Sequence, residues 1–261
     1  MLFLSLAAAT FFGLIVGSFL NVCIYRLPRE KSIVWPGSAC PSCGHAIRWY
    51  DNVPVFSYLF LLGKCRDCSS KISFRYPLVE LLTGVLTLLF TLRYWQTPLW
   101  LVCCLVAVYA LIVITFIDID FMIIPDQLSL GLAVLGLLSS PVNPLFEGAW
   151  TVRVAVSLLG AAVGFGIIWI LASVGELMFK KEAIGGGDLK LMTAAGAIAG
   201  WQGVVVTLMI GSLLGSIYGG AMLLSKKLER KQPIPFGPFL CAALLLYLYK
   251  PIPLSAFLWQ P

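Results

Sequence analysis

The chain has 261 residues, of which 60% are apolar and only 11% are charged, and its mean hydropathy is +0.95. A soluble globular domain carries about 25% charged residues, so this composition excludes an ordinary water-soluble fold. Because a helix needs roughly 20 apolar residues to cross a bilayer, the chain is expected to be an all-α polytopic membrane protein. The stretches without any charged residue that support this expectation are 2–25, 99–117, 127–146, 154–175, 191–225 and 232–249.

About eight transmembrane helices are expected, at approximately 2–25, 77–95, 99–117, 127–146, 152–177, 188–202, 204–225 and 235–258. The first is interpreted as a retained helix, because its basic flank (Arg26 and Arg29) follows the apolar part, whereas in a signal peptide basic residues precede it. The stretch 191–225 is too long for one span and short for two. Gly and an interfacial Trp favour a turn at 199–203, and one long tilted helix with a re-entrant piece is the alternative.

The distribution of basic residues predicts the orientation. With eight spans, the loops 26–76, 178–190 and 226–231 fall on one side and hold 15 of the 18 Lys and Arg residues. Cytoplasmic loops carry an excess of Lys and Arg, so this side is expected to be the cytoplasm and the N-terminus to face out. The net charge of +6 is thereby explained by topology, and no nucleic-acid binding is expected. The expected domains are a first helix (1–25), a cytoplasmic module (26–76) and a transmembrane domain (77–261).

A four-cysteine pattern marks the one polar stretch, between the first two expected helices. Cys40 and Cys43 form one C-x-x-C pair, and Cys65 and Cys68 form another after a gap of 21 residues. Two such pairs can complete a tetrahedral zinc site, and a segment with little apolar mass needs such a metal to fold. Two disulfides or a redox-active pair are the alternatives, and a reducing cytoplasm argues against disulfides. His45 is expected to be a surface or second-sphere residue and not a ligand.

Acidic residues stand at the ends of two expected spans. Asp188 follows the glycines Gly185, Gly186 and Gly187, and Asp118 ends the uncharged run 99–117. By the topology above, both meet the membrane on the same side and can face each other. Two close carboxyl groups share a proton, so one can activate water while the other donates to a peptide carbonyl, as in aspartic proteases.

Other roles remain open for these acids from the residues alone. Acids at a helix start can cap it, and paired acids can relay protons in a transporter. Asp126 follows a proline and precedes an apolar run, so it is expected to be an N-cap. Asp120 is expected to be intermediate between a structural and a catalytic acid.

The constellation resembles the type IV prepilin peptidases. The resemblance lies in "GGGD", the upstream D-x-D-x-x-x-x-P-D, the four-cysteine module, "GSFLNVCIYRLP" at 17–28, "RYPLVELLTG" at 75–84 and "PIPFGPFL" at 233–240. These motifs run from the first helix to near the end of the chain in the family's order. In the family's motifs, the first Asp of the upstream motif and the Asp of GxGD form the catalytic pair, and they map onto Asp118 and Asp188.

The resemblance implies a bacterial inner-membrane aspartic peptidase that removes the basic leader from prepilins or pseudopilins at the cytoplasmic face. It also implies N-methylation of the new amino terminus with S-adenosylmethionine and zinc in the cysteine module. Separately, the glycines 185–187 lack side chains and would let a substrate strand lie beside Asp188, so they are expected to support the site together with Lys190 and Asp120. The methyl-donor site and the oligomeric state stay unassigned. A GxGD peptidase without methylation and a proton-coupled transporter with a regulatory zinc module are the alternatives.

Overall fold

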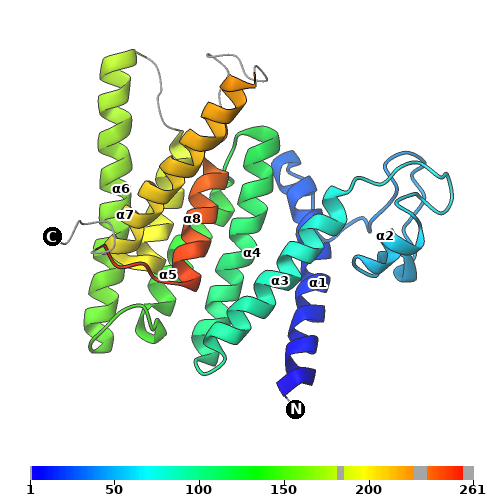
Figure 1. The fold of residues 1–261 in the computed structure, drawn as a ribbon, viewed down its shortest axis with the longest axis horizontal. Coiled ribbons are helices and arrows are strands. Elements are labelled where there is room, and N and C mark those ends of the chain that lie inside the picture. Colours follow the sequence, from blue (N-terminus) through cyan, green and yellow to red (C-terminus); the bar gives the residue numbers. More distant parts are fainter. Residues whose placement is uncertain (1, 181–184, 226–233, 255–261) are drawn as a thin grey trace. The chain divides into compact units, whose positions relative to one another are not determined.

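The computed structural model describes residues 2–180, 185–225 and 234–254, and the described chain is helical, with no β-strand beyond two isolated bridges (Figure 1). Its α-helices are α1 (Leu2–Arg26), α2 (Phe56–Phe60), α3 (Arg75–Tyr94), α4 (Pro98–Phe121), α5 (Asp126–Ser139), α6 (Trp150–Phe179), α7 (Gly186–Leu224) and α8 (Gly237–Tyr249). Short 3-10 helices are η1 (Leu27–Arg29), η2 (Trp49–Asn52) and η3 (Ser140–Val142). Five helices (α1, α3, α4, α6 and α7) are long and apolar enough to cross a membrane, which confirms the expected all-α polytopic class.

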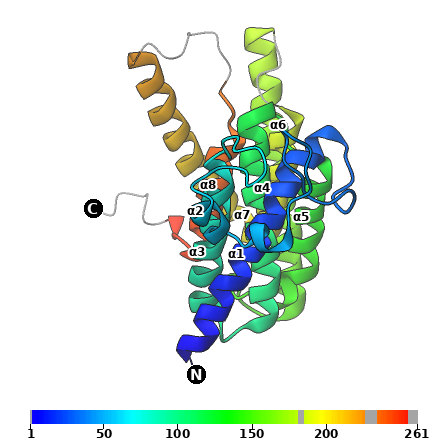
Figure 2. The same cartoon turned by 90° about the vertical axis from the view of Figure 1, so that its right-hand side faces the viewer.

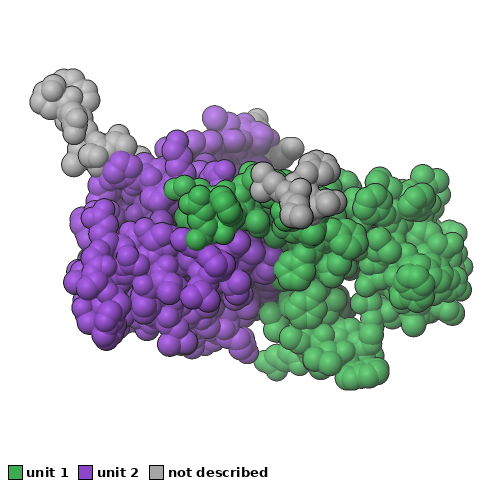
Figure 3. Space-filling model, turned by 90° about the horizontal axis from the view of Figure 1, so that it is seen from below, with its two compact units in different colours: residues 1–96 green, residues 97–261 purple. Residues whose placement is uncertain are grey.

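The chain divides into two compact units, residues 1–96 and 97–261, which Figure 3 colours separately. The first unit contains the cysteine module together with α1 and α3. The second contains α4 to α8. The division into 1–25, 26–76 and 77–261 stays a prediction.

In the first unit, α1 and α3 pack closely because glycines line their interface. A Cβ at Gly17 would lie 2.7 Å from the Cα of Glu80, and a Cβ at Gly13 would lie 2.5 Å from the hydroxyl of Thr87. Asn21 also donates from Nδ2 to the carbonyl of Tyr76 at 3.1 Å. The end of α1 is therefore fixed against the beginning of α3.

In the second unit, α7 is central and packs against α5, α6 and α8. Gly160 of α6 and Gly196 of α7 meet so closely that a Cβ on either residue would overlap the carbonyl oxygen of the other. Buried side chains bond across the same region, since Ser157 donates to the carbonyl of Ala197 at 2.6 Å. These contacts hold the first half of α7, which carries Asp188, in one place.

Helix α7 is interrupted at Gly200, where the sequence predicts a turn. Gly200 has φ 70° and ψ 177°, a conformation that is essentially restricted to glycine. The two legs of α7 therefore point in different directions, and the second leg diverges from α6 (Figure 2). The expectation of two helices within 188–225 is confirmed, with the break inside the predicted turn.

Two helices are shorter than expected. α5 ends at Ser139 instead of residue 146, because Pro141 lies in a 3-10 turn and cannot continue the α-helical hydrogen bonds. α8 ends at Tyr249, because Pro251 and Pro253 follow it. Part of its expected range falls on 255–258, outside the described residues. Lys181 and the basic residues of 226–231 also lie outside the described residues, and the predicted orientation partly depends on them.

Candidate active site and metal centre

Asp118 lies in the last turn of α4 and is 5% exposed. Its Oδ2 accepts a 3.0 Å hydrogen bond from the backbone N–H of Gly237, the first residue of α8. The first N–H groups of a helix have no partner within the helix, and the positive end of its dipole favours an anion. The start of α8 thus gives this buried carboxyl group both a donor and a favourable field.

Asp188 is the third residue of α7, and its N–H donates to the carbonyl of Gly185, the N-cap, at 3.1 Å. It is partly buried, whereas Gly185 and Gly186 are exposed. Gly187, next to Asp188, and Gly237, the donor to Asp118, both lie against Ile124, so the two acids belong to one site. The structure therefore brings together, from the ends of two helices, the two acids that the sequence analysis paired.

Ile124 lies beside both halves of this site. A Cβ at Gly187 would be 2.9 Å from the Cβ of Ile124, and a Cβ at Gly237 would be 3.3 Å from its Cδ1. The glycine before Asp188 and the glycine that donates to Asp118 therefore pack on one apolar side chain. Of the three glycines in the GGGD loop, Gly187 is the one for which the structure supplies a tight contact.

Lys190 and Asp126 form an ion pair, with Nζ and Oδ1 2.6 Å apart. The expectation that Asp126 is an N-cap is wrong. Pro125 holds the N-cap position of α5, and no side chain caps this helix. Asp126 is instead the first residue of the helix, and its carboxylate ties α5 to the first turn of α7. Asp120 is exposed near the end of α4, and its supporting role stays a prediction.

Gly237 is the part of this site that the sequence analysis missed. The motif "PIPFGPFL" contains it, and the glycine followed by a proline is a typical start for a helix. What the sequence could not reveal is that this helix begins against Asp118, 119 residues earlier in the chain.

The four cysteines of the first unit converge, as their spacing predicts. The Sγ atoms of Cys40, Cys43, Cys65 and Cys68 all lie within 4.8 Å of one another. Four sulfurs, each ~2.3 Å from a tetrahedral zinc ion, would be ~3.8 Å apart. The Cys40 and Cys68 sulfurs are 3.8 Å apart, so the cluster fits a four-coordinate metal ion. His45 is exposed and is not part of the cluster, as expected.

The cysteine pairs lie on two copies of one turn, 25 residues apart in sequence. In the first copy, the N–H of Cys40 bonds the carbonyl of His45 and the N–H of Gly44 bonds the carbonyl of Cys40. In the second, Cys65 bonds Ser70 and Ser69 bonds Cys65 in the same way. The bridges Ala39–Ala46 and Lys64–Lys71 close both turns. We call residues 38–47 and 63–72 the first and second knuckle.

Backbone and side-chain contacts favour ionised sulfur at Cys40 and Cys68. At Cys43, the backbone N–H of His45 is outweighed by burial and by the neighbouring Cys40 and Cys68 sulfurs, which together raise the pKa of the thiol to about 12. Backbone N–H groups of Cys43 and Ser42, with the Ser70 hydroxyl, lower the pKa of the Cys40 thiol to about 6. The Ser70 hydroxyl also lies 3.0 Å from the Cys68 sulfur. Thiolates are the form in which cysteine binds metals.

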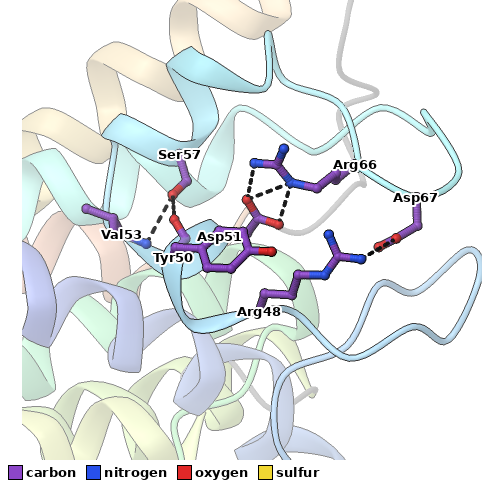
Figure 4. A network of polar contacts seen from close by, with 7 residues as sticks. All are labelled: Arg48, Tyr50, Asp51, Val53, Ser57, Arg66 and Asp67. Carbon is purple, nitrogen blue, oxygen red and sulfur yellow. Dashed lines mark hydrogen bonds and ion pairs between the residues drawn. The ribbon is translucent and has the colours of Figure 1, made fainter.

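Ion pairs attach the segment between the knuckles to the second knuckle (Figure 4). Arg66 donates from Nε to both carboxylate oxygens of Asp51, at 3.0 and 2.9 Å, and Arg48 pairs with Asp67 at 3.2 Å. The bond to Arg66 lowers the pKa of the Asp51 carboxyl. Within the same segment, the Ser57 hydroxyl donates to the carbonyl of Tyr50 at 2.9 Å.

The remaining cysteines lie in apolar helices: Cys23, Cys103, Cys104 and Cys241. Three of them are buried and Cys103 is partly exposed, which fits their interpretation as small hydrophobic residues.

The chain matches known proteins over most of its length. Residues 11–94 match the bacterial peptidase A24 N-terminal domain, and residues 105–220 match the type IV leader peptidase family. The chain is 38% identical to a prepilin leader peptidase/N-methyltransferase of Aeromonas salmonicida over 258 residues, covering 89% of this chain and 86% of that protein.

Proteins of the same name from two other bacteria are similarly related. Identity is 37% for Pseudomonas aeruginosa, covering 88% of this chain and 85% of that protein. It is 43% for Myxococcus xanthus, covering 86% of this chain and 67% of that protein. No solved structure matches the chain.

Proposed function

This chain belongs to the type IV leader peptidase family, and we propose that it removes the leader peptide from prepilins with Asp118 and Asp188 as its catalytic pair. The observation that carries the proposal is that the acids at the ends of α4 and α7 lie around one side chain, since Gly187, next to Asp188, and Gly237, the donor to Asp118, both pack on Ile124. A cap or a helix-dipole role would require neither acid to approach the other.

The arrangement supports hydrolysis by general acid and base. One carboxylate takes a proton from a water molecule, and the oxygen of that water bonds to the carbonyl carbon of the scissile peptide. The other carboxyl group donates its proton to the carbonyl oxygen. The carbon–nitrogen bond then breaks as the first carboxyl group, now protonated, gives its proton to the leaving nitrogen, while a hydroxyl of the tetrahedral intermediate returns a proton to the second carboxylate. The donor at Gly237 favours the ionised state of Asp118, so we assign the base to Asp118 and the acid to Asp188.

Conversion of each acid to its amide tests the catalytic assignment. Asp118→Asn and Asp188→Asn should each abolish leader cleavage, because the reaction needs a base and an acid at the same moment. Asn is nearly isosteric with Asp, so expression, helicity and metal content should be retained. Cleavage is measured by gel shift with a coexpressed prepilin. Wild-type cleavage by Asp188→Asn would exclude the aspartyl mechanism.

Two further acids near the pair provide controls, Asp120 on α4 and Asp126 on α5. Asp126→Asn should lower cleavage only mildly. The Asp126 side chain is 59% exposed, and its ion pair is with Lys190, which is itself partly exposed. Asp120→Asn should fall between the two classes. Equal loss in all four variants would indicate a general effect of charge removal and not catalysis by one pair.

We further propose that the four cysteines hold one structural zinc ion. Cysteine would fill all four positions, so the ion would keep no open site for chemistry. Its contribution would be to fold residues 38–72, whose two knuckles bury little apolar surface. This assignment rests on the sulfur positions and on the repeated turn geometry described above.

The second activity is N-methylation of the amino terminus that cleavage produces, for which the relatives' names imply S-adenosylmethionine as methyl donor. A cavity of about 330 Å³ lies between the second leg of α7 and residues 234–239. It is lined by Ser212, Gly215, Ser216, Ile234, Pro235, Phe236 and Phe239. None of these residues carries a charge that could bind the sulfonium, ammonium or carboxylate of the donor, so we do not assign the methyl-donor site to this cavity.

The methyltransfer test is separate from the cleavage test. Mass spectrometry of the mature prepilin N-terminus reports both steps, and a substrate supplied already cleaved should still be methylated by the Asp118→Asn variant. An unmethylated product from the wild-type enzyme would support a peptidase alone. We place the protein in the bacterial inner membrane as a multi-pass enzyme, with its acids and its cysteine module on the cytoplasmic side.

A further inference from the structure

An apolar segment separates the two knuckles of the cysteine module. Residues 55–62 read "VFSYLFLL" and contain α2. Their large side chains are exposed: Leu59 is 62% exposed, Phe60 84% and Leu62 84%. A water-facing loop of a small metal-folded module has no reason to expose three such side chains within four residues. We call residues 55–62 the apolar loop.

The apolar loop is fixed beside the membrane helices of its own unit. The N–H of Val55 donates a 2.7 Å hydrogen bond to Oε2 of Glu80 in α3. Glu80 in turn packs on α1, because a Cβ at Gly17 would lie 2.7 Å from its Cα. Gly17 precedes the last residue of α1, Arg26, by nine residues, which corresponds to ~13 Å along the helix at ~1.5 Å per residue.

The apolar loop therefore lies beside an inner part of α1 and α3, and not beyond the helix ends that lead into the module. Figure 1 shows the same relation, with α2 beside these helices and below the end of α1 that leads into the module. Within these parts of the two helices, Phe19 of α1 and Leu78 and Leu81 of α3 are also exposed. The apolar loop thus adds its exposed apolar side chains to those that both helices already expose.

We propose that residues 55–62 insert into the lipid leaflet at the end of the membrane where α1 ends and α3 begins, so that the cysteine module has a third membrane attachment. The occupant of the exposed face is the acyl-chain region of that leaflet, near the headgroups. Aromatic and aliphatic side chains are favoured at this depth, and burying Phe60 and Leu62 there removes from water the surface that the protein leaves uncovered.

The structure holds the apolar loop in a defined position for this contact. Ser57 accepts a 3.1 Å hydrogen bond from the N–H of Val53 and donates to Tyr50, which fixes the start of α2 on η2. η2 is in turn bound to the second knuckle through Asp51 and Arg66 (Figure 4). The membrane depth of the apolar loop is therefore linked mechanically to the position of the cysteine cluster.

A lipid crosslinking experiment tests the proposal on the full-length protein. The protein is placed in nanodiscs whose phospholipids carry a diazirine in the acyl chain, and adducts are mapped by mass spectrometry after illumination. Residues 55–62 should be labelled at least about fivefold more than the first knuckle, and comparably to the lipid-facing surface of α3, as expected for an interfacial segment. Labelling no higher than that of the first knuckle would overturn the proposal.

Charge substitutions separate insertion from folding. Phe60→Asp should reduce the labelling of residues 55–62 severalfold while the zinc content stays at the wild-type level. Val34→Asp places the same charge at a side chain that is also exposed (73%) but lies outside the apolar loop, and it should leave the labelling unchanged. Unchanged labelling in Phe60→Asp would contradict insertion.

A competing occupant gives a different result. If a saturating prepilin removes the lipid adducts from residues 55–62, the exposed face binds the substrate and the lipid assignment is wrong. Persistence of the adducts supports lipid as the occupant. The readout is labelling and not cleavage, so it stays valid whatever the outcome for Asp118 and Asp188.

Discussion

The N–H of Gly237 donates a 3.0 Å hydrogen bond to Oδ2 of Asp118 and thereby joins the start of α8 to the last turn of α4. A Cβ at Gly237 would lie 2.7 Å from that oxygen and 3.3 Å from Cδ1 of Ile124. Gly237→Ala should therefore displace the carboxyl group or lengthen the hydrogen bond. Misplacement of a catalytic group by ~1 Å can cost ~100-fold in rate, so we expect cleavage to fall by about 10- to 100-fold in kcat.

Gly131→Ala is the matched control for Gly237→Ala. Gly131 lies on α5 in the same unit, and a Cβ there would meet nothing within 4 Å. This variant should keep wild-type cleavage, since Ala is favoured over Gly in a helix by about 1 kcal/mol. A Gly237→Ala enzyme that cleaves as fast as Gly131→Ala would contradict a positioning role for the start of α8.

The elements that carry the acids were predictable from sequence, whereas the contact that orients one of them was not. Asp118 and Asp188 stand at the ends of uncharged runs, and hydropathy alone places both runs in helices. The break at Gly200 was predictable as well, because glycines cluster where the uncharged stretch exceeds one span. The approach of Gly237 to Asp118 depends on how α8 packs against α4. The periodicity of a sequence does not indicate which two helices pack together.

The role of Asp126 shows the limit of local reasoning. An acid after a proline and before an apolar run fits a cap, yet the proline itself takes the N-cap position. The carboxylate was left available for Lys190, 64 residues away. Local sequence describes which positions can cap a helix, but not which cation a folded chain brings to an exposed acid.

One left-handed position of the repeated turn holds glycine in the first knuckle and serine in the second, which yields a stability prediction. Gly44 and Ser69 are equivalent in the repeat and have φ of 71° and 58°. A non-glycine residue in this left-handed region costs roughly 1 kcal/mol, so Ser69→Gly should be neutral or stabilise the module by up to that amount. Gly44→Ala should destabilise it similarly. Zinc retention during a chelator titration measures both, and a Gly44→Ala module as stable as wild type would refute the equivalence.

Metal removal should affect the first unit selectively. Metal analysis of the purified protein should give about one zinc per chain, the number that four cysteine ligands hold. Stripping the ion with a chelator should make residues 38–72 sensitive to protease, because the knuckles have no core of their own. Cys40→Ser should have the same effect, while helicity and the protease resistance of α4 to α8 persist. A native module with a metal content near zero would exclude zinc as its folding element.

The ion pair between Lys190 and Asp126 connects the first turn of α7 to the first residue of α5, and its contribution can be measured by a double-mutant cycle. Partly exposed ion pairs contribute about 0.2–1 kcal/mol, so Lys190→Met and Asp126→Asn should each lower thermal stability slightly. The double variant should lose no more than either single variant, because both remove one interaction. Cleavage should fall at most severalfold in all three, since neither side chain takes part in the proton transfers assigned to Asp118 and Asp188.

Lys250→Met removes a lysine beyond the far end of α8 and should be fully additive with Asp126→Asn. Additive losses in the Lys190→Met/Asp126→Asn pair would show that the 2.6 Å contact contributes nothing to stability, and complete loss of cleavage in Lys190→Met would instead place Lys190 in the catalytic machinery.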